Sequence, residues 1–476
     1  MTRVALVVAL LFVAGAASPP PSAQIASDPQ PPRATLAVVG GVLIDGHEGP
    51  PLPNSVILVD GKRIVAVGTR DSLKVPSGAK VIDAAGYYVM PGLIDRHVHL
   101  DLLGYGGVGD KAGYVYWHKT YGPRYETIAE ASARQLLMQG VTTAVDLGGD
   151  PAIQTKMRQR INDGQIPGPR MLMSMGWITN WSDEQFATHH RGKPGTGPSG
   201  VQVFNVQTVA EAQQAIDKTV AMGADIVKLY TGLTAEQMKV ISEGARKKGL
   251  RITGHVSGKA DALMRIRGGQ QAIEHMGFDA SDEEIVRELI ARRTVVVPTN
   301  VQSLAATLAI EEPTWLDNPR FKLLTPPDLY SDIRESLTHV NRIAYFGGTL
   351  RPRRIDESLA EVKRLYDAGV ALGIGTDSGT PANFHTDSTW RQMELMVRAG
   401  IPAPDVIAMA TRVNAQGLGL GNEVGTIDRG KVADLIVVDG NPLRDIGALR
   451  HVVYVVKEGV QHKGPQPGGA AKTTSP

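Results

Sequence analysis

Between about residues 90 and 420 the sequence alternates short apolar runs with amphipathic segments, and this alternation limits the possible folds more than any other feature. Eight runs have the character of strands: 88–99, 142–147, 170–175, 225–230, 251–255, 271–275, 294–298 and 371–377. Helical periodicity occurs at about 125–139, 151–162, 207–222, 234–248, 258–268, 281–292, 355–369, 388–399 and 404–417. Repeated strand–helix units build a parallel sheet, and eight of them predict an α/β fold with a closed (β/α)8 TIM-type barrel over residues 90–420. An open doubly wound sheet is the alternative, but no Gly-x-Gly-x-x-Gly turn follows the first strand.

The segments on either side of this region have a different texture. Residues 35–89 and 421–463 consist of short Val- and Ile-rich runs separated by Gly and Asp turns. Strand-rich ends around a different middle predict a small composite β-sandwich domain built from both ends of the chain. Two independent β-modules are the alternative, although each would be small for a core of its own.

The first residues of the chain predict export. Arg3 is followed by a short apolar run and then by small residues, which is typical of a cleavable signal peptide over residues 1–23, with cleavage after Ala16, Ala17 or Ala23. We therefore expect a secreted or periplasmic protein with no stable membrane insertion after cleavage; an uncleaved membrane anchor is the alternative. The Pro-rich leader 24–34 and the tail 464–476 are predicted to be disordered.

Composition narrows the chemistry that such a protein can perform. The 476 residues carry a net charge of +2 and show no clustered Lys/Arg stripe, so nucleic acid is not an expected partner. The chain has no Cys, which excludes disulfides, thiolate catalysis and Cys-ligated metals. Any metal must be held chiefly by His and carboxylate side chains.

Ionisable residues stand at the ends of several predicted strands. His97 and His99 end the first strand, and alternate strand residues face the same way. Taken alone, that pair could be two satisfied polar residues. Further polar strand ends are Lys228 in the fourth, His255 in the fifth, His275 in the sixth and Asp377 in the eighth. Because catalytic residues of such barrels gather at the carboxyl ends of the strands, these six side chains are predicted to converge.

These motifs resemble the amidohydrolase superfamily over nearly the whole mature chain. The resemblance rests on the six residues above, on the runs Pro91-Gly-Leu-Ile-Asp-Arg-His-Val-His99 and Gly375-Thr-Asp-Ser378, and on the closing run 425–439. The most similar subgroup has a binuclear centre bridged by a carboxylated lysine, and includes prolidase-like and imidazolonepropionase-related enzymes. The resemblance implies two divalent metal ions, zinc or alternatively manganese, cobalt or iron. It places His97, His99 and Asp377 on one ion, and His255 and His275 on the other.

Lys228 is the residue to which this resemblance assigns the most specific chemistry. An ammonium cannot ligate a cation, but burial favours the neutral amine, which can add carbon dioxide and become an anionic carbamate. Carbon dioxide is therefore an expected cofactor, held on Lys228. The alternative is an outward-facing lysine paired with Asp225 or Glu236.

The implied reaction is hydrolysis of a carbon–nitrogen bond in a small-molecule or dipeptide substrate. Metal-bridging hydroxide would attack an Xaa-Pro dipeptide or an N-acyl amino acid, with Asp377 as general base and acid. Tyr230 shares the strand face of Lys228 and is a candidate hydrogen-bond donor to substrate. Two alternatives remain: the same centre acting on a lactone, carbamate or phosphoester, and a non-catalytic binding protein of the same family. We also expect a homo-oligomer.

Three long connections are candidate substrate lids. They are 101–124, the stretch from Trp177 to Phe204, and 301–354, the last of which is long enough to add helices over the pocket. His118, His189 and His190 lie in the first two, and we interpret them as loop residues rather than metal ligands.

Overall fold

A computed structural model of the chain describes residues 33–104, 120–185, 200–302, 305, 317, 319–338 and 355–465. The predicted signal peptide, almost all of the leader and most of the tail lie outside these residues and stay predictions. Within the described ranges, no helix has both the length and the apolarity needed to cross a bilayer.

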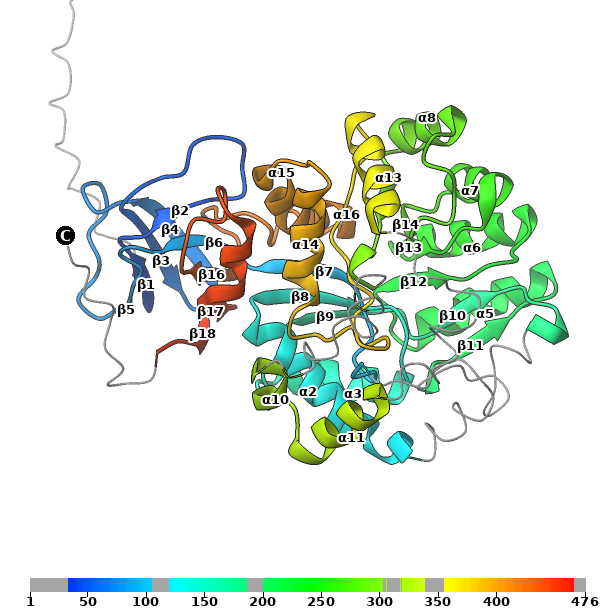
Figure 1. The fold of residues 1–476 in the computed structure, drawn as a ribbon, viewed down its shortest axis with the longest axis horizontal. Coiled ribbons are helices and arrows are strands. Elements are labelled where there is room, and N and C mark those ends of the chain that lie inside the picture. Colours follow the sequence, from blue (N-terminus) through cyan, green and yellow to red (C-terminus); the bar gives the residue numbers. More distant parts are fainter. Residues whose placement is uncertain are drawn as a thin grey trace, which may run out of the picture.

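Strands from the two ends of the chain lie together at one end of the molecule (Figure 1). One sheet has the order β4-β3-β1-β5 and a second the order β18-β17-β16-β6-β2, in which β16 pairs antiparallel with β6. Side chains of both sheets, including Leu36, Ile57, Leu435 and Val456, form one buried apolar cluster. The predicted domain boundaries themselves stay a prediction. The strands are β1 (Leu36–Val39), β2 (Val42–Leu43), β3 (Ser55–Asp60), β4 (Arg63–Thr69), β5 (Lys80–Asp83), β6 (Tyr88–Pro91), β16 (Leu435–Val438), β17 (Val452–Lys457) and β18 (Val460–Lys463).

The middle of the chain is a mixed α/β structure with two parallel sheets. The first has the order β7-β8-β9 and the second the order β11-β10-β12-β13-β14-β15. These strands are β7 (Leu93–Val98), β8 (Val141–Asp146), β9 (Arg170–Met173), β10 (Trp177–Thr179), β11 (Val203–Asn205), β12 (Ile226–Leu229), β13 (Arg251–Gly254), β14 (Ala272–Glu274) and β15 (Val295–Val297).

Hydrogen bonds connect the two parallel sheets on both sides, from β9 to the start of β12 and from β7 to the edge strand β15 through an extended segment. The Asp225 amide, just before β12, donates to the Met173 carbonyl of β9 at 2.9 Å. On the other side, the segment 371–378 forms single parallel bridges, Leu372 with Val296 of β15 and Ser378 with Val98 of β7. The predicted eighth strand is therefore present as a bridged extended segment and not as a regular strand, and the closed barrel stays a prediction. Gly375 allows the close approach, because a Cβ there would lie 2.5 Å from a methyl carbon of Val297.

Helices occupy the segments that the periodicity predicts, to within a few residues, and two more helices lie in the described part of the long connection 301–354. They are α2 (Tyr125–Met138), α3 (Pro151–Asn162), α5 (Val209–Ala221), α6 (Ala235–Lys247), α7 (Gly258–Arg267), α8 (Glu283–Arg292), α10 (Pro319–Leu324), α11 (Pro327–Thr338), α13 (Ile355–Asp367), α14 (Ser388–Arg398), α15 (Ala403–Ala408) and α16 (Asn414–Leu418). Capping boxes begin two of them: the Thr208 hydroxyl caps α5 and the Thr234 hydroxyl caps α6. The predicted helix 404–417 contains a π-helical turn, Met409–Val413, between α15 and α16.

Two strand predictions were wrong in detail. The run 88–99 is not one strand: β6 pairs with β16, β7 pairs with β8, and Gly92 lies between them. A Cβ at Gly92 would lie 2.1 Å from the Thr142 hydroxyl oxygen, so glycine is required where the chain passes from one sheet to the other. The long connection 177–204 begins with β10 and ends within β11, so it extends the second parallel sheet. Sequence periodicity did not predict these two strands, because each has only three residues.

Candidate metal centre

The six predicted site residues all lie at or just beyond strand ends. His97 belongs to β7 and His99 follows it, Lys228 belongs to β12, and His255 and His275 directly follow β13 and β14. Asp377 lies in the bridged segment beside β7, where its amide donates to the His97 carbonyl at 2.7 Å. The exposed fraction is 1% for His97 and Lys228, 5% for Asp377 and 8% for His99, so these four residues are almost fully removed from water, whereas His255 and His275 are of intermediate exposure.

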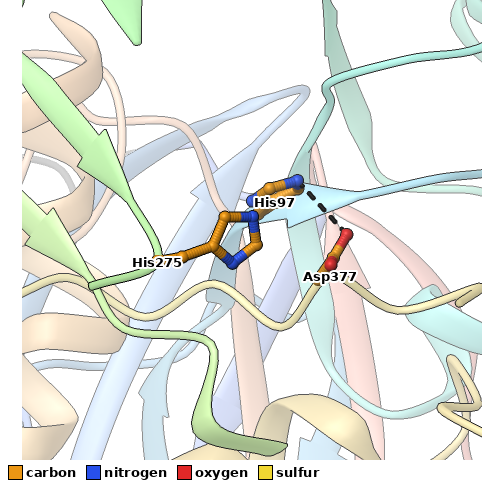
Figure 2. A group of neighbouring side chains, drawn as sticks. All are labelled: His97, His275 and Asp377. Atoms are coloured by element: carbon orange, nitrogen blue, oxygen red, sulfur yellow. Dashed lines mark ion pairs between the residues drawn. The ribbon is translucent and has the colours of Figure 1, made fainter. Parts of the chain in front are cut away.

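The Asp377 carboxylate joins the histidines that end β7. Its Oδ1 lies 3.3 Å from Nε2 of His97 and 3.0 Å from Nε2 of His99. Its Oδ2 accepts a hydrogen bond of 2.6 Å from the Gln302 amide, which follows β15. His275 approaches from the other side, and one ligand atom each of His97, His275 and Asp377 lie within 4.8 Å of one another (Figure 2).

The remaining ring nitrogens of three histidines are held by polar groups. His97 Nδ1 donates to the Glu274 carboxylate at 2.9 Å, His99 Nδ1 donates to the Gly148 carbonyl at 2.9 Å, and His275 Nδ1 lies 2.6 Å from the Thr299 hydroxyl. In metal sites such partners fix the tautomer of a ligating imidazole and raise its basicity. Each Nε2 is thereby directed into the shared space.

His255 and Lys228 complete the group next to His275. The rings of His255 and His275 have centroids 4.6 Å apart. The Nζ of Lys228 and the Nδ1 of His255 are both buried, and neither has a hydrogen-bond partner among the residues that the structure describes. An unpaired buried amine is costly. These two atoms are therefore positioned for a further group that the protein itself does not supply.

The electrostatics of the group favour neutral imidazoles at His97, His255 and His275 and an ionised carboxylate at Asp377. Burial lowers the pKa of His97, His255 and His275. Burial would raise the pKa of Asp377, but the neighbouring histidines hold it below its usual value. Burial likewise disfavours charged His99, although its hydrogen bond to Asp377 leaves its pKa raised.

Burial also shifts the pKa values of Lys228 and Tyr230. The pKa of Lys228 falls to about 8, against the opposing charges of Glu274 and Asp377. The pKa of Tyr230 rises to about 12, so its hydroxyl keeps its proton at neutral pH. The ring of Tyr230 lies against His255, with centroids 4.1 Å apart.

The backbone at the site departs from the usual L-residue conformation. His275, Thr299 and Asp377 have φ values of 66°, 49° and 56°, in the left-handed region. Such conformations persist where the surrounding structure enforces them, and they gather at functional sites. Here they occur directly after β14, two residues after β15, and within the bridged segment.

The sequence did not single out every polar residue of the site. Glu274, Gln302 and Thr299 bind the predicted ligands. His385 is a buried histidine, and neither of its ring nitrogens has a hydrogen-bond partner within the described part of the chain. Burial lowers the pKa of His385 to about 3. Glu274 could have been identified from the sequence, because it is a charged residue at the end of an apolar strand, in Ile273-Glu-His275. His118, His189 and His190 lie outside the described residues.

The donor set fits divalent cations. Neutral imidazoles and a carboxylate are ligands that zinc and similar ions prefer. The polar groups behind the rings are typical of metal-ligating histidines. The partnerless amine of Lys228 lies among these side chains, as expected for a lysine that carries a further group.

Comparison with known proteins gives a consistent result. A family model described as the amidohydrolase family matches residues 88–463. The chain is 25% identical over 471 residues to the ochratoxinase of Aspergillus niger, covering 90% of this chain and 86% of that protein. It is also 25% identical to a 5-methylthioadenosine/S-adenosylhomocysteine deaminase of Symbiobacterium thermophilum, covering 83% and 84%. In structure it is similar to an Xaa-Pro dipeptidase, with a TM-score of 0.68, 24% identity, and coverage of 90% of this chain and 100% of that one.

Proposed function

This chain belongs to the amidohydrolase family, and we propose that it hydrolyses the amide bond of a small substrate such as an Xaa-Pro dipeptide or an N-acyl amino acid. As a family member it is a hydrolase of carbon–nitrogen bonds. The observation that carries the proposal is the convergence of four histidines and Asp377 beside the partnerless amine of Lys228. The names of the ochratoxinase and the Xaa-Pro dipeptidase agree with it.

We propose that these side chains hold two divalent cations, with zinc favoured. His97, His99 and Asp377 would bind one ion, and His255 and His275 the other. Lys228 Nζ would add carbon dioxide, releasing one proton, and the resulting carbamate would bridge the two. Bound there, the cations would polarise the substrate carbonyl and lower the pKa of a water molecule.

Asp377 is the proposed proton carrier of the reaction. It is ionised at rest, because its histidine neighbours keep its pKa low. Its Oδ1 faces His97 and His99, and its Oδ2 is held by Gln302, so the carboxylate has a fixed orientation. We propose that it takes a proton from the attacking water and gives it to the leaving nitrogen.

Tyr230 is the proposed donor to the substrate carbonyl. It lies beside His255, and its raised pKa keeps the proton on the oxygen. A preorganised donor of this kind stabilises the charge that develops on a carbonyl oxygen during attack.

We further propose that the two parallel sheets close into the predicted (β/α)8 barrel. Support comes from the bond between Asp225 and Met173 and from the bridges of segment 371–378. Buried side chains of three strands, Ile94, Val145 and Ile226, also meet in one cluster with residues of α16 and of the segment after it. Closure would bring all six site residues to one end of the barrel.

A substrate panel tests the proposed reaction. The purified zinc-loaded protein is assayed with Gly-Pro, N-acetylmethionine and N-acetylphenylalanine, and with a lactone, a carbamate and a phosphoester. We expect amide hydrolysis to exceed the other reactions. Asp377→Asn should lower kcat by about 10²–10⁴-fold with an unchanged circular dichroism spectrum. The exposed variant Asp367→Asn serves as the matched control. Turnover of the lactone, the carbamate or the phosphoester without any amide hydrolysis would contradict the proposal. Full activity of Asp377→Asn would also contradict it.

A further inference from the structure

A series of aromatic rings continues outward from the histidines of the metal centre. The ring of Tyr230 lies 4.1 Å from His255 on one side and 5.1 Å from the indole of Trp177 on the other, measured between centroids. The interplanar angles are 35° and 34°, so the three rings face each other at a modest tilt. Beyond His255 the series continues to His275 and His97.

Trp177 is held in this series by its backbone and by its indole nitrogen. It belongs to β10, in register with Lys228 of the neighbouring strand β12. Its Nε1 donates to the Leu147 carbonyl at 2.6 Å, directly after β8. The indole packs over Gly148, where a Cβ would lie 2.6 Å from Nε1. The Gly148 carbonyl in turn accepts the hydrogen bond from His99.

Trp177 and Tyr230 are partly exposed to solvent, whereas two of the proposed metal ligands are buried. Both are of intermediate exposure, as are His255 and His275, while Lys228 and His97 are buried. Trp181 backs Tyr230 edge-on at 5.0 Å and is almost fully buried, together with Val201 and Val203. The result is an uncharged, rigid aromatic surface beside the proposed metal ligands.

We propose that Trp177, packed against Tyr230, forms an aromatic subsite that receives a planar ring of the substrate. This inference rests on the proposed function and narrows it to N-acyl amino acids or dipeptides with an aromatic side chain. Only the ring of Tyr230 lies between Trp177 and His255 in this series, so a substrate ring in contact with Trp177 would be close to the proposed ligands His255 and His275. Offset or edge-to-face ring contacts favour an aromatic ligand over a saturated one of similar size.

Matched ligand pairs test the subsite. Benzoate and cyclohexanecarboxylate share the carboxylate and differ in the planarity of the ring. Their dissociation constants for the zinc-loaded protein are measured by ligand-observed NMR, which needs no turnover. N-acetylphenylalanine and N-acetylcyclohexylalanine are compared in parallel by kcat/KM. We expect the planar member of each pair to be favoured by roughly two- to tenfold.

Three variants assign that preference to Trp177. Trp177→Leu should lose it, and Trp177→Phe should keep it although the hydrogen bond to Leu147 is gone. Trp390→Leu is the control: Trp390 of α14 lies between the guanidinium groups of Arg391 and Arg450, and its loss should leave the preference unchanged.

The outcomes separate this inference from the proposed reaction. Equal affinity for benzoate and cyclohexanecarboxylate in the unmodified protein would overturn the subsite, and this result does not depend on any variant folding. A preference that survives in Trp177→Leu would also overturn it. If no amide is hydrolysed but the preference is present and requires Trp177, the subsite stands and the proposed reaction does not.

Discussion

Glu274 determines which nitrogen of His97 faces the centre. One carboxylate oxygen accepts from His97 Nδ1 at 2.9 Å and the other accepts from the Thr253 hydroxyl, with both partners buried. The Nε2 of His97 is therefore left as an electron-pair donor for a cation. Glu274 acts through His97 and is a positioning residue rather than a ligand.

Removing the charge of Glu274 is expected to weaken metal binding. Glu274→Gln keeps the size of the side chain but no longer fixes His97 as a donor at Nδ1. We expect the apparent affinity for zinc to fall by about 10–100-fold, as measured by competition with a chromophoric chelator. Glu283→Gln, an exposed position on α8, is the control. Unchanged zinc affinity in Glu274→Gln would show that His97 needs no such partner.

At the scale of elements, strand spacing decides whether the ligands meet. Gly254 of β13 pairs in register with Leu229 of β12, and a Cβ at Gly254 would lie 2.4 Å from the Leu229 carbonyl oxygen. His255 follows directly. A side chain at this position would force the two strands apart at the point where they carry Lys228 and His255.

Gly254→Ala should therefore affect both stability and the site. We expect the free energy of unfolding to fall by about 1–3 kcal/mol, the usual effect of overpacking, together with a loss of zinc content. Urea denaturation and metal analysis measure the two effects. Gly78→Ala is the control, because a Cβ at Gly78 would have no atom within 4 Å and the φ of this residue is not positive. Wild-type stability in Gly254→Ala would contradict the strand spacing described above.

The sequence predicted elements better than it predicted their contacts. Helix positions and the six strand-end residues follow from local periodicity and from the rule that barrel sites gather at strand ends. The division of 88–99 at Gly92 was missed, because it depends on contact with Thr142. Glu274 and Trp177 were missed for a similar reason: the partner of Glu274 is His97, 177 residues away in sequence. Three-residue strands such as β10 are too short to show a period.

On the scale of the whole molecule, Arg170 ties the parallel sheet to the strands of the chain ends. From β9 its guanidinium donates to Asp434 at 2.6 Å and to Glu458 at 3.1 Å, next to β16 and β17 respectively. The Asp434 side chain is 2% exposed, so it has little access to water if Arg170 is lost. A buried charge without its partner is strongly destabilising.

Arg170→Met tests how much the ion pairs of Arg170 contribute to stability. We expect the free energy of unfolding to fall by about 3 kcal/mol, measured by urea denaturation. Arg398→Met, which breaks an exposed pair with Asp356, should change it by about 0–1 kcal/mol. Equal effects of the two substitutions would mean that the Arg170 pairs do not couple the two parts of the molecule.

The most direct test of the central claim is a metal titration of the metal-free protein and of Lys228→Ala. The protein is dialysed against a chelator in the presence of bicarbonate, and zinc is returned in steps while bound metal and amide hydrolysis are followed together. We expect activity to be lost on chelation and to return as occupancy reaches two ions per chain. We also expect Lys228→Ala to retain at most one ion and to be partly rescued by short carboxylic acids. Full hydrolysis by the metal-free protein, or two tightly bound ions and normal turnover in Lys228→Ala, would contradict the proposed binuclear centre.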